Sequence, residues 1–247
     1  MTQAMIVVRG ALRSYPNGTK ALRGVDLEVP RGSRFALLGP NGAGKSTLIK
    51  ILATIGRPDS GSVEIDGIPL SGSALAARSR MGAALQDVQL DPEARPAEQL
   101  ELQGRLFGLP KAEAEARAAE LVRRFDLAAV EGKKAKELSG GNKRRLHVAL
   151  ALVHRPSLVI LDEPTAGMDP EIRAAFWAET RRLNEEEGVT IFFSTQYLEE
   201  AERHAEELAV LDGGRVAFRG KVAEFAAAHS GEDLESSYLK FLEASRG

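Results

Sequence analysis

The hydrophobic positions form short apolar runs near both ends of the chain, with helical periodicities between them. Turn sequences separate the early runs, which predict strands at residues 5–8, 25–29, 35–38 and 63–65. Beyond residue 157, apolar runs alternate with helical segments, and strands are predicted at 158–161, 189–193 and 208–211. This alternation predicts an α/β fold, in which helices cover both faces of a mostly parallel sheet.

Two sets of apolar residues at positions i, i+3, i+4 and i+7 predict buried helix faces. They are Leu48, Ile51, Leu52 and Ile55, and Ala118, Leu121, Val122 and Phe125. Further helices are predicted to start at Pro170 and to run through Leu198 and Ala201. Residues 1–220 are therefore interpreted as one α/β domain with a helical insertion at about 90–155. Residues 221–247 are interpreted as a tail of two short helices.

Composition narrows the class of protein. The 247 residues suffice to bury a core without disulfides or a structural metal. Lys and Arg number 33 against 35 Asp and Glu, so the net charge of −2 gives no general attraction to nucleic acid. Cysteine is absent, which excludes a thiol nucleophile and fits a reducing compartment. No apolar run is long enough to predict a membrane span or a signal peptide.

A glycine-rich loop follows the predicted strand at 35–38 and opens the next helix. It consists of Gly39, Pro40, Asn41, Gly42, Ala43, Gly44, Lys45, Ser46 and Thr47. Glycines let successive backbone N–H groups turn toward one anion, and a helix N-terminus adds partial positive charge. Lys45 is predicted to reach the β- and γ-phosphates of a nucleotide, and Ser46 to hold Mg²⁺. The alternative is a tight strand-to-helix turn with an incidental lysine.

An acidic pair, Asp162 and Glu163, ends the predicted strand at 158–161. Ligands of open α/β sheets bind at the carboxyl ends of the strands. Asp162 is therefore predicted to complete the Mg²⁺ shell, and Glu163 to polarise the attacking water. The alternative is an ordinary chain reversal at Glu163 and Pro164.

A second possible anion site lies at Ser139, Gly140 and Gly141, which precede another helical stretch. A serine followed by bare backbone N–H groups at a helix start suits a phosphate. The alternative is a serine that only caps the helix. Two phosphate sites per chain require two nucleotides, or a dimer in which this helix start caps the nucleotide of the other subunit.

Four ordered motifs, at 39–47, 138–142, 158–164 and 167–169, together resemble the ATP-binding subunits of ABC transporters. The resemblance extends over residues 5–220 and implies a P-loop NTPase domain of the ABC type, with an N-terminal antiparallel β-subdomain. It implies ATP and Mg²⁺ as cofactors and a head-to-tail dimer around two ATP, either a homodimer or a pair with another ABC ATPase subunit. It also implies a transmembrane permease partner and a cytoplasmic position on the inner face of the cell membrane.

The same resemblance assigns roles to single residues. Tyr15 matches the aromatic residue that stacks on adenine; the alternative is an ordinary strand-end tyrosine. Gln86 matches the glutamine that reaches the metal and water site and borders the membrane partner; the alternative is an exposed turn residue. Asp169 matches an interface aspartate and also suits an N-cap. Gln196 stands where the family usually has a switch histidine, and residues 194–202 resemble the daunorubicin/doxorubicin-resistance exporters.

The sequence thus predicts an ATP-hydrolysing subunit that powers a separate transmembrane exporter of drugs or other amphipathic compounds. One alternative is a soluble ABC-type ATPase that acts as a mechanochemical regulator. Another is a small-molecule kinase that uses the same phosphate loop. Co-purification with membranes separates the exporter from the regulator, and ATPase activity without an acceptor separates both from a kinase.

Overall fold

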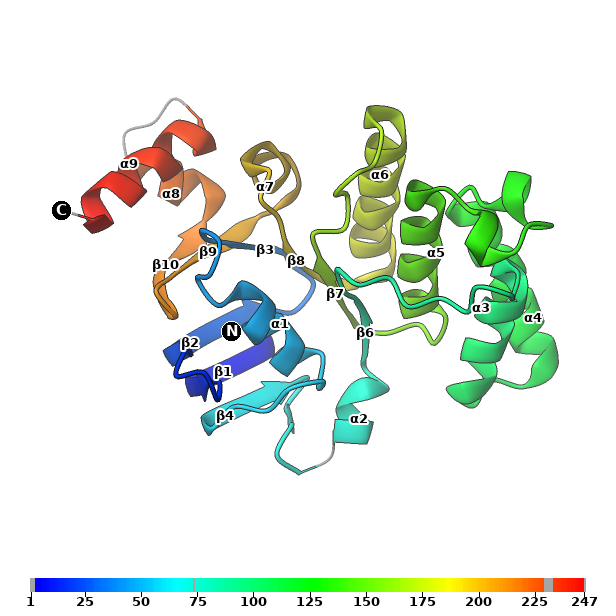
Figure 1. The fold of residues 1–247 in the computed structure, drawn as a ribbon, viewed down its shortest axis with the longest axis horizontal. Helices are drawn as coiled ribbons and strands as arrows, with labels where there is room; N and C mark the ends of the chain where they lie inside the picture. Colours follow the sequence, from blue (N-terminus) through cyan, green and yellow to red (C-terminus); the bar gives the residue numbers. More distant parts are fainter. Residues whose placement is uncertain (1–2, 73, 229–232, 247) are drawn as a thin grey trace.

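The computed structural model describes residues 3–72, 74–228 and 233–246, and its strands form two sheets (Figure 1). One is a four-stranded antiparallel sheet in the order β2-β1-β4-β5. Its strands are β1 (Ala4–Ser14), β2 (Lys20–Pro30), β4 (Ser60–Ile65) and β5 (Ile68–Pro69). The first two extend beyond the predicted apolar runs because buried residues keep alternating with polar ones along the strand, the pattern of a sheet with one covered face.

The second sheet has six strands in the order β10-β9-β3-β8-β7-β6. These strands are β3 (Arg34–Leu38), β6 (Met81–Ala84), β7 (Leu158–Asp162), β8 (Thr190–Ser194), β9 (Glu207–Asp212) and β10 (Arg215–Lys221). All pairs are parallel except β9 with β10, which confirms the predicted mostly parallel sheet. Every residue of β7 and β8 is buried, as expected for strands covered on both faces.

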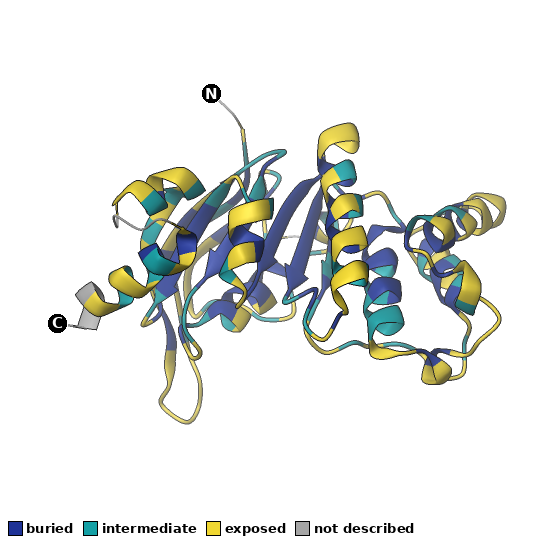
Figure 2. Cartoon of the chain, turned by 90° about the horizontal axis from the view of Figure 1, so that it is seen from above, coloured by how far each residue is buried: buried dark blue, intermediate teal, exposed yellow. Residues whose placement is uncertain are grey.

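Successive side chains of the parallel sheet enter two different hydrophobic cores, because neighbouring residues of a strand point to opposite faces. Phe35 and Leu37 of β3 pack with residues of β1, β2 and α1 (Lys45–Leu52). Ala36 and Leu38 pack with residues of the helices on the other face, including α6 (Pro170–Glu187) and α7 (Leu198–His204). Figure 2 shows the buried strands between helices whose outer faces are exposed.

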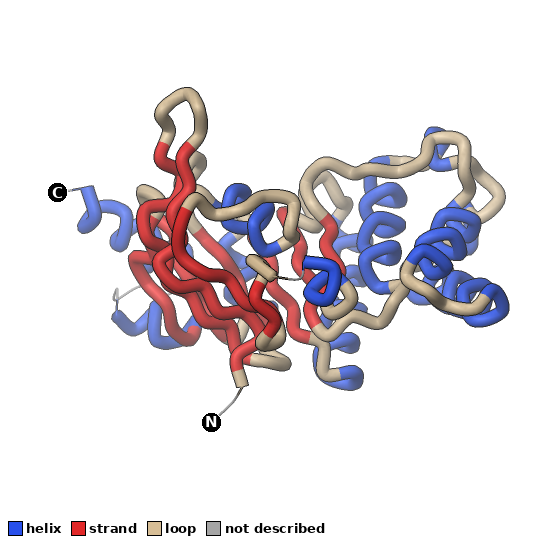
Figure 3. The backbone as a smooth tube through the Cα atoms, turned by 90° about the horizontal axis from the view of Figure 1, so that it is seen from below, coloured by secondary structure: helices blue, strands red, loops and turns tan. Residues whose placement is uncertain are grey.

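Helices α3 (Pro96–Leu106), α4 (Lys111–Arg124) and α5 (Gly140–Leu152) form a lobe beside the parallel sheet (Figure 3). The short helix α2 (Ala74–Arg78) precedes β6, and two 3₁₀ turns, η1 (Ala128–Val130) and η2 (Ala135–Glu137), lie between α4 and α5. The predicted α4 face is confirmed, since Ala118, Leu121, Val122 and Phe125 are all buried.

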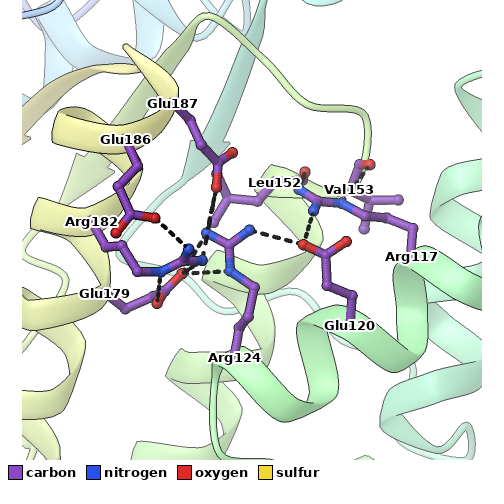
Figure 4. A network of polar contacts seen from close by, with 9 residues as sticks. All are labelled: Arg117, Glu120, Arg124, Leu152, Val153, Glu179, Arg182, Glu186 and Glu187. Carbon is purple, nitrogen blue, oxygen red and sulfur yellow. Dashed lines mark hydrogen bonds and ion pairs between the residues drawn. The ribbon is translucent and has the colours of Figure 1, made fainter.

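Arg117 and Arg124 of α4 join that helix to the end of α5 and to α6 (Figure 4). Arg124 forms ion pairs with Glu179 at 2.6 Å and Glu187 at 2.8 Å, both on α6. Arg117 donates from Nη2 to the backbone oxygen of Leu152 at 2.9 Å, at the C-terminus of α5. Glu120 lies between the two arginines and accepts from both. We call Arg117, Glu120, Arg124, Glu179 and Glu187 the α4–α6 ion cluster.

The C-terminal helices α8 (Val222–Ala228) and α9 (Leu234–Arg246) follow β10 and pack on the face that α7 covers. Phe225 of α8 is fully buried, and its ring centroid lies 4.8 Å from that of Phe218 and 5.8 Å from that of Phe241. Within residues 3–72, 74–228 and 233–246, no helix has the length and apolarity needed to cross a membrane.

The predicted face of α1 is wrong at its last position. Leu48, Ile51 and Leu52 are buried, but Ile55 is 67% exposed. The helix ends at Leu52, and Thr54 has a φ of +61°, so the chain turns before Ile55. A left-handed residue at a helix end stops the 3.6-residue repeat, and the periodicity of the sequence does not reveal such a turn.

Candidate functional site

The glycine-rich loop joins the carboxyl end of β3 to the start of α1. Gly39 and Gly44 have positive φ angles of +150° and +107°. A Cβ atom at Gly39 would lie 2.2 Å from the backbone oxygen of Leu211, and one at Gly44 would lie 2.4 Å from that of Ala21. The loop therefore requires glycine at both places for its backbone course and for its close contact with neighbouring strands. The first N–H groups of α1 have no intrahelical acceptors and are the donors that an anion would meet.

Lys45 is buried within this loop. Its Nζ donates to the backbone oxygens of Gly39 at 2.6 Å and Pro40 at 3.1 Å. Burial lowers the pKa of Lys45, while the nearby negative charges of Glu163 and Asp162 act to raise it. The lysine thus lies among the loop carbonyls with both carboxylates of the acidic pair close by.

The acidic pair is fixed by a serine that the sequence analysis did not identify. Ser194, the last residue of β8, pairs with Asp162 across the sheet and is fully buried. Its Oγ donates to Asp162 Oδ1 at 2.6 Å and accepts from the backbone N–H of Glu163 at 3.1 Å. Glu163 has a φ of +48° and remains partly exposed, whereas Asp162 is buried. One hydroxyl therefore orients both acidic residues.

Tyr15 lies beside the first turn of α1. Its hydroxyl is 3.1 Å from Thr47 Oγ1, and the Arg13 guanidinium lies 5.5 Å from its ring centroid. Arg13 is held by an ion pair with Asp59 at 2.8 Å. Tyr15 as a whole is 37% exposed, so a ligand at the glycine-rich loop can reach it.

Gln196 and Gln86 follow the carboxyl ends of two other parallel strands. Gln196 is exposed and lies two residues after β8, and Gln86 is exposed and lies two residues after β6. The strands β3, β8, β7 and β6 are direct neighbours in the sheet. Their carboxyl ends lie at one edge, so the structure brings together the glycine-rich loop, Gln196, the acidic pair and Gln86.

Ser139, Gly140 and Gly141 lie in the helical lobe, where α5 begins at Gly140. Ser139 is the N-cap, and its side chain accepts from the backbone N–H of Asn142 at 3.3 Å. In the part of the chain that the structure describes, no hydrogen bond or ion pair joins these three residues to residues 39–47. This helix start belongs to α5 of the helical lobe, whereas the glycine-rich loop joins β3 to α1.

Ser46 is exposed, and among the described residues the Asp162 side chain accepts a hydrogen bond only from Ser194. A hydroxyl and a carboxylate are the hard oxygen donors that Mg²⁺ prefers. The described residues hold no group of three or more His, Cys, Asp or Glu side chains that could hold a metal. The residues therefore fit a magnesium ion that takes its other ligands from a nucleotide and water, rather than an all-protein metal site.

Comparison with known proteins places the glycine-rich loop and the acidic pair within a known protein family. The family model of ABC transporters matches residues 22–166. The chain is 43% identical to daunorubicin resistance ATP-binding protein DrrA3 of Streptomyces coeruleorubidus, over 95% of this chain and 74% of that protein. It is 42% identical to daunorubicin/doxorubicin resistance ATP-binding protein DrrA of Streptomyces peucetius, over 89% of this chain and 66% of that protein.

The fold is similar to that of the ATP-binding cassette MJ0796, which has been solved as a dimer bound to ADP and Pi. The TM-score is 0.82 at 28% sequence identity, and the match covers 88% of this chain and 98% of MJ0796.

Proposed function

The chain belongs to the ABC transporter family, and on that basis we propose that it is the ATP-hydrolysing subunit of a membrane exporter whose permease is a separate chain. The observation that carries the proposal is the shared edge of the parallel sheet. Four neighbouring strands bring a glycine-rich loop with Lys45, an acidic pair, Gln196 and Gln86 to that edge. A site of this kind positions a nucleoside triphosphate and a water, which is what phosphoryl transfer requires.

ATP binds at the loop between β3 and α1. The first N–H groups of α1 and the Lys45 ammonium bind the β- and γ-phosphates, because both present positive charge at one point. Tyr15 stacks on the adenine, with its ring steadied by Thr47 and Arg13. Ser46, Asp162 and Gln86 hold Mg²⁺, which when bound neutralises phosphate charge.

Hydrolysis uses the residues that follow β7, β8 and β6. The Glu163 carboxylate accepts a hydrogen bond from the attacking water and polarises it. Gln196 donates its amide N–H to the γ-phosphate, a role that a neutral glutamine fills with a weaker bond than a charged histidine would. Gln86 orients the same water and lies next to the permease. Ser194 keeps Asp162 and Glu163 in place for both tasks.

The active unit is a dimer with shared sites, most simply a homodimer. Ser139, Gly140 and Gly141 form an anion-binding helix start that does not meet the chain's own glycine-rich loop, so it serves the ATP of a second copy. The dimeric solved relative supports this arrangement. ATP binding closes the dimer, and hydrolysis with product release opens it.

The cargo is a drug or another amphipathic compound, and the permease selects it. This part of the proposal rests on the resistance proteins to which the chain is similar. The exporter places this subunit at the inner face of the cell membrane. Nothing in the described residues favours a soluble mechanochemical regulator or a kinase over this function.

The proposal is tested by comparing Glu163→Gln with Lys45→Ala in ATP binding and ATPase assays. Glu163→Gln is expected to keep ATP affinity, lose turnover and accumulate an ATP-bound dimer, because only the water-polarising carboxylate is removed. Lys45→Ala is expected to weaken ATP binding itself. Glu199→Gln, an exposed carboxylate change on α7, is the matched control and should keep wild-type turnover. Near-normal hydrolysis by Glu163→Gln, or unchanged ATP affinity in Lys45→Ala, would contradict the assigned roles.

Subunit sharing is tested separately with Ser139→Arg. This variant should bind ATP as a single chain but fail to form the ATP-driven dimer. Mixed with Lys45→Ala, it should regain at most one of two composite sites. Full activity of Ser139→Arg alone would exclude shared sites.

A further inference from the structure

A buried carboxylate outside the nucleotide site joins two of its loops. Glu200, in the first turn of α7, is only 4% exposed. Its Oε1 accepts from Thr165 Oγ1 at 2.5 Å, and its Oε2 accepts from Thr195 Oγ1 at 2.8 Å. Both threonines are themselves buried. The two carboxylate oxygens thus bind two different segments of the chain.

The first of these segments carries Glu163. Thr165 lies two residues after it, and the backbone closes a turn there, since the N–H of Ala166 donates to the oxygen of Glu163 at 3.3 Å. The N–H of Met168 in turn donates to the oxygen of Thr165 at 3.0 Å. A hold on the Thr165 side chain therefore restrains the turn that begins at the water-polarising residue.

The second segment carries Gln196. Thr195 Oγ1 donates to Glu200 and also accepts from the backbone N–H of Tyr197 at 3.0 Å. The hydroxyl therefore bridges the residue after Gln196 to the carboxylate, and the backbone N–H of Glu200 donates back to the oxygen of Tyr197 at 3.0 Å. Gln196 lies at the tip of this short loop with its side chain exposed.

We propose that Glu200 is a positioning residue for ATP hydrolysis, which holds the Glu163 loop and the Gln196 loop in a fixed mutual arrangement through its two carboxylate oxygens. This inference rests on the proposed function, because it needs both loops to act on one γ-phosphate and one water. A misplacement of about 1 Å can lower a rate about 100-fold.

The groups around Glu200 support the view that its charged carboxylate is needed at this position. A buried carboxylate is costly unless it is paired and hydrogen-bonded. Here two hydroxyls donate to it, and Arg173 Nε of α6 lies 3.8 Å from Oε1. The Arg173 guanidinium also lies 5.2 Å from the ring centroid of Tyr197, so the same arginine covers the second loop. An apolar residue at position 200 would fill the space without joining the two hydroxyls.

Hydrogen exchange tests the tie without relying on catalysis. In Glu200→Ala, backbone amides of both 163–169 and 195–198 are expected to exchange at least about tenfold faster than in wild type, because both loops lose their anchor. Glu200→Gln should restore much of the protection, since threonine hydroxyls can donate to its oxygen and accept from its amide. Glu199→Gln, on the same turn of α7 but exposed, should leave both loops unchanged.

A double-mutant cycle with Gln196→Ala tests the functional consequence. Glu200→Ala should lower kcat about 10–100-fold while the KM for ATP changes by less than about threefold, because Lys45 and the loop N–H groups are untouched. The effect of Gln196→Ala should then nearly vanish in the Glu200→Ala background. Thr180→Ala removes a buried hydroxyl that donates to the backbone oxygen of Phe176 in its own helix α6. It is the structural control and should be additive with Gln196→Ala.

If Glu200→Ala folds poorly, Thr195→Val and Thr165→Val can replace it, because each removes one of the two hydrogen bonds to the Glu200 carboxylate. Each should speed hydrogen exchange only in the loop that carries the substituted threonine. The proposal would be overturned if Glu200→Ala speeds hydrogen exchange in only one of the two loops or in neither. It would also be overturned if the effects of Glu200→Ala and Gln196→Ala on kcat are additive. A wild-type protein without ATPase activity would instead overturn the proposed function, and the exchange result would still decide the role of Glu200.

Discussion

Ser194→Ala probes the serine that orients the acidic pair, and its effect on stability can be worked out from the structure. The hydroxyl is fully buried and donates to the Asp162 carboxylate at 2.6 Å. A hydrogen bond to a charged group contributes about 1.5–3 kcal/mol. The second bond, from the N–H of Glu163, adds little to the loss, because that N–H keeps the backbone oxygen of Ser194 as an acceptor at 3.2 Å. We expect Ser194→Ala to lower the free energy of unfolding by about 1.5–3 kcal/mol.

Ser237→Ala is the matched control for this loss. Ser237 is equally buried, but its hydroxyl donates to the neutral backbone oxygen of Asp233 at 2.9 Å. Its removal should cost about 1 kcal/mol. Urea unfolding monitored by tryptophan fluorescence measures both losses, as shifts of the midpoint at a constant m-value. If the free energy of unfolding of Ser194→Ala is no lower than that of Ser237→Ala, the view that Ser194 stabilises a buried charge is refuted.

Three further predictions concern other regions. Gln196→Ala should slow the ATPase, whereas Gln196→His should equal or exceed wild type and add a rate step between about pH 6 and 7, measured as a pH profile. Arg124→Met should lower the free energy of unfolding by about 2–4 kcal/mol, because it breaks the α4–α6 ion cluster. Arg182 is more exposed, so Arg182→Met should lower it by less than about 1 kcal/mol in the same urea titration. Burial and three nearby arginines lower the pKa of His204 to about 4. The free energy of unfolding is therefore expected to fall as the pH drops from about 6.5 toward 4, because the unfolded chain binds the proton first. His204→Gln should make this fall with pH smaller, measured by unfolding titrations at several pH values.

Strands β3, β7, β8 and β9 of the six-stranded sheet could be predicted from the sequence because they are buried on both faces and appear as continuous apolar runs, whereas the edge strand β6 was not predicted. The runs at 158–161 and 189–193 correspond to β7 and β8, with ends displaced by at most one residue. The edge strand β10 was not predicted. Its residues alternate between exposed and half-buried, and such a strand gives no apolar run. Ile55 was misplaced because a single left-handed residue, Thr54, ended the helix before it.

Motifs along the chain identified the candidate site where spacing is local, as in residues 39–47. They could not identify Ser194 or Glu200, because each acts through a contact between segments about 30 residues apart in sequence. A serine at the end of an apolar strand and a glutamate in a charged helix look ordinary in a sequence. Their importance arises only when strand pairing and helix packing place them beside Asp162, Thr165 and Thr195.

The α4–α6 ion cluster has a consequence for the exchange of parts between related proteins. The arginines come from α4, whereas Glu179 and Glu187 come from a helix more than fifty residues later. A chimera that takes the helical lobe from one protein and the sheet from another would separate these charges. It would leave the carboxylates of α6 without the arginine that pairs with them. The helical lobe can therefore be exchanged between related proteins only if residues 117–124 and residues 179–187 are taken from the same protein. Substitutions in one of these two segments are expected to require matching substitutions in the other.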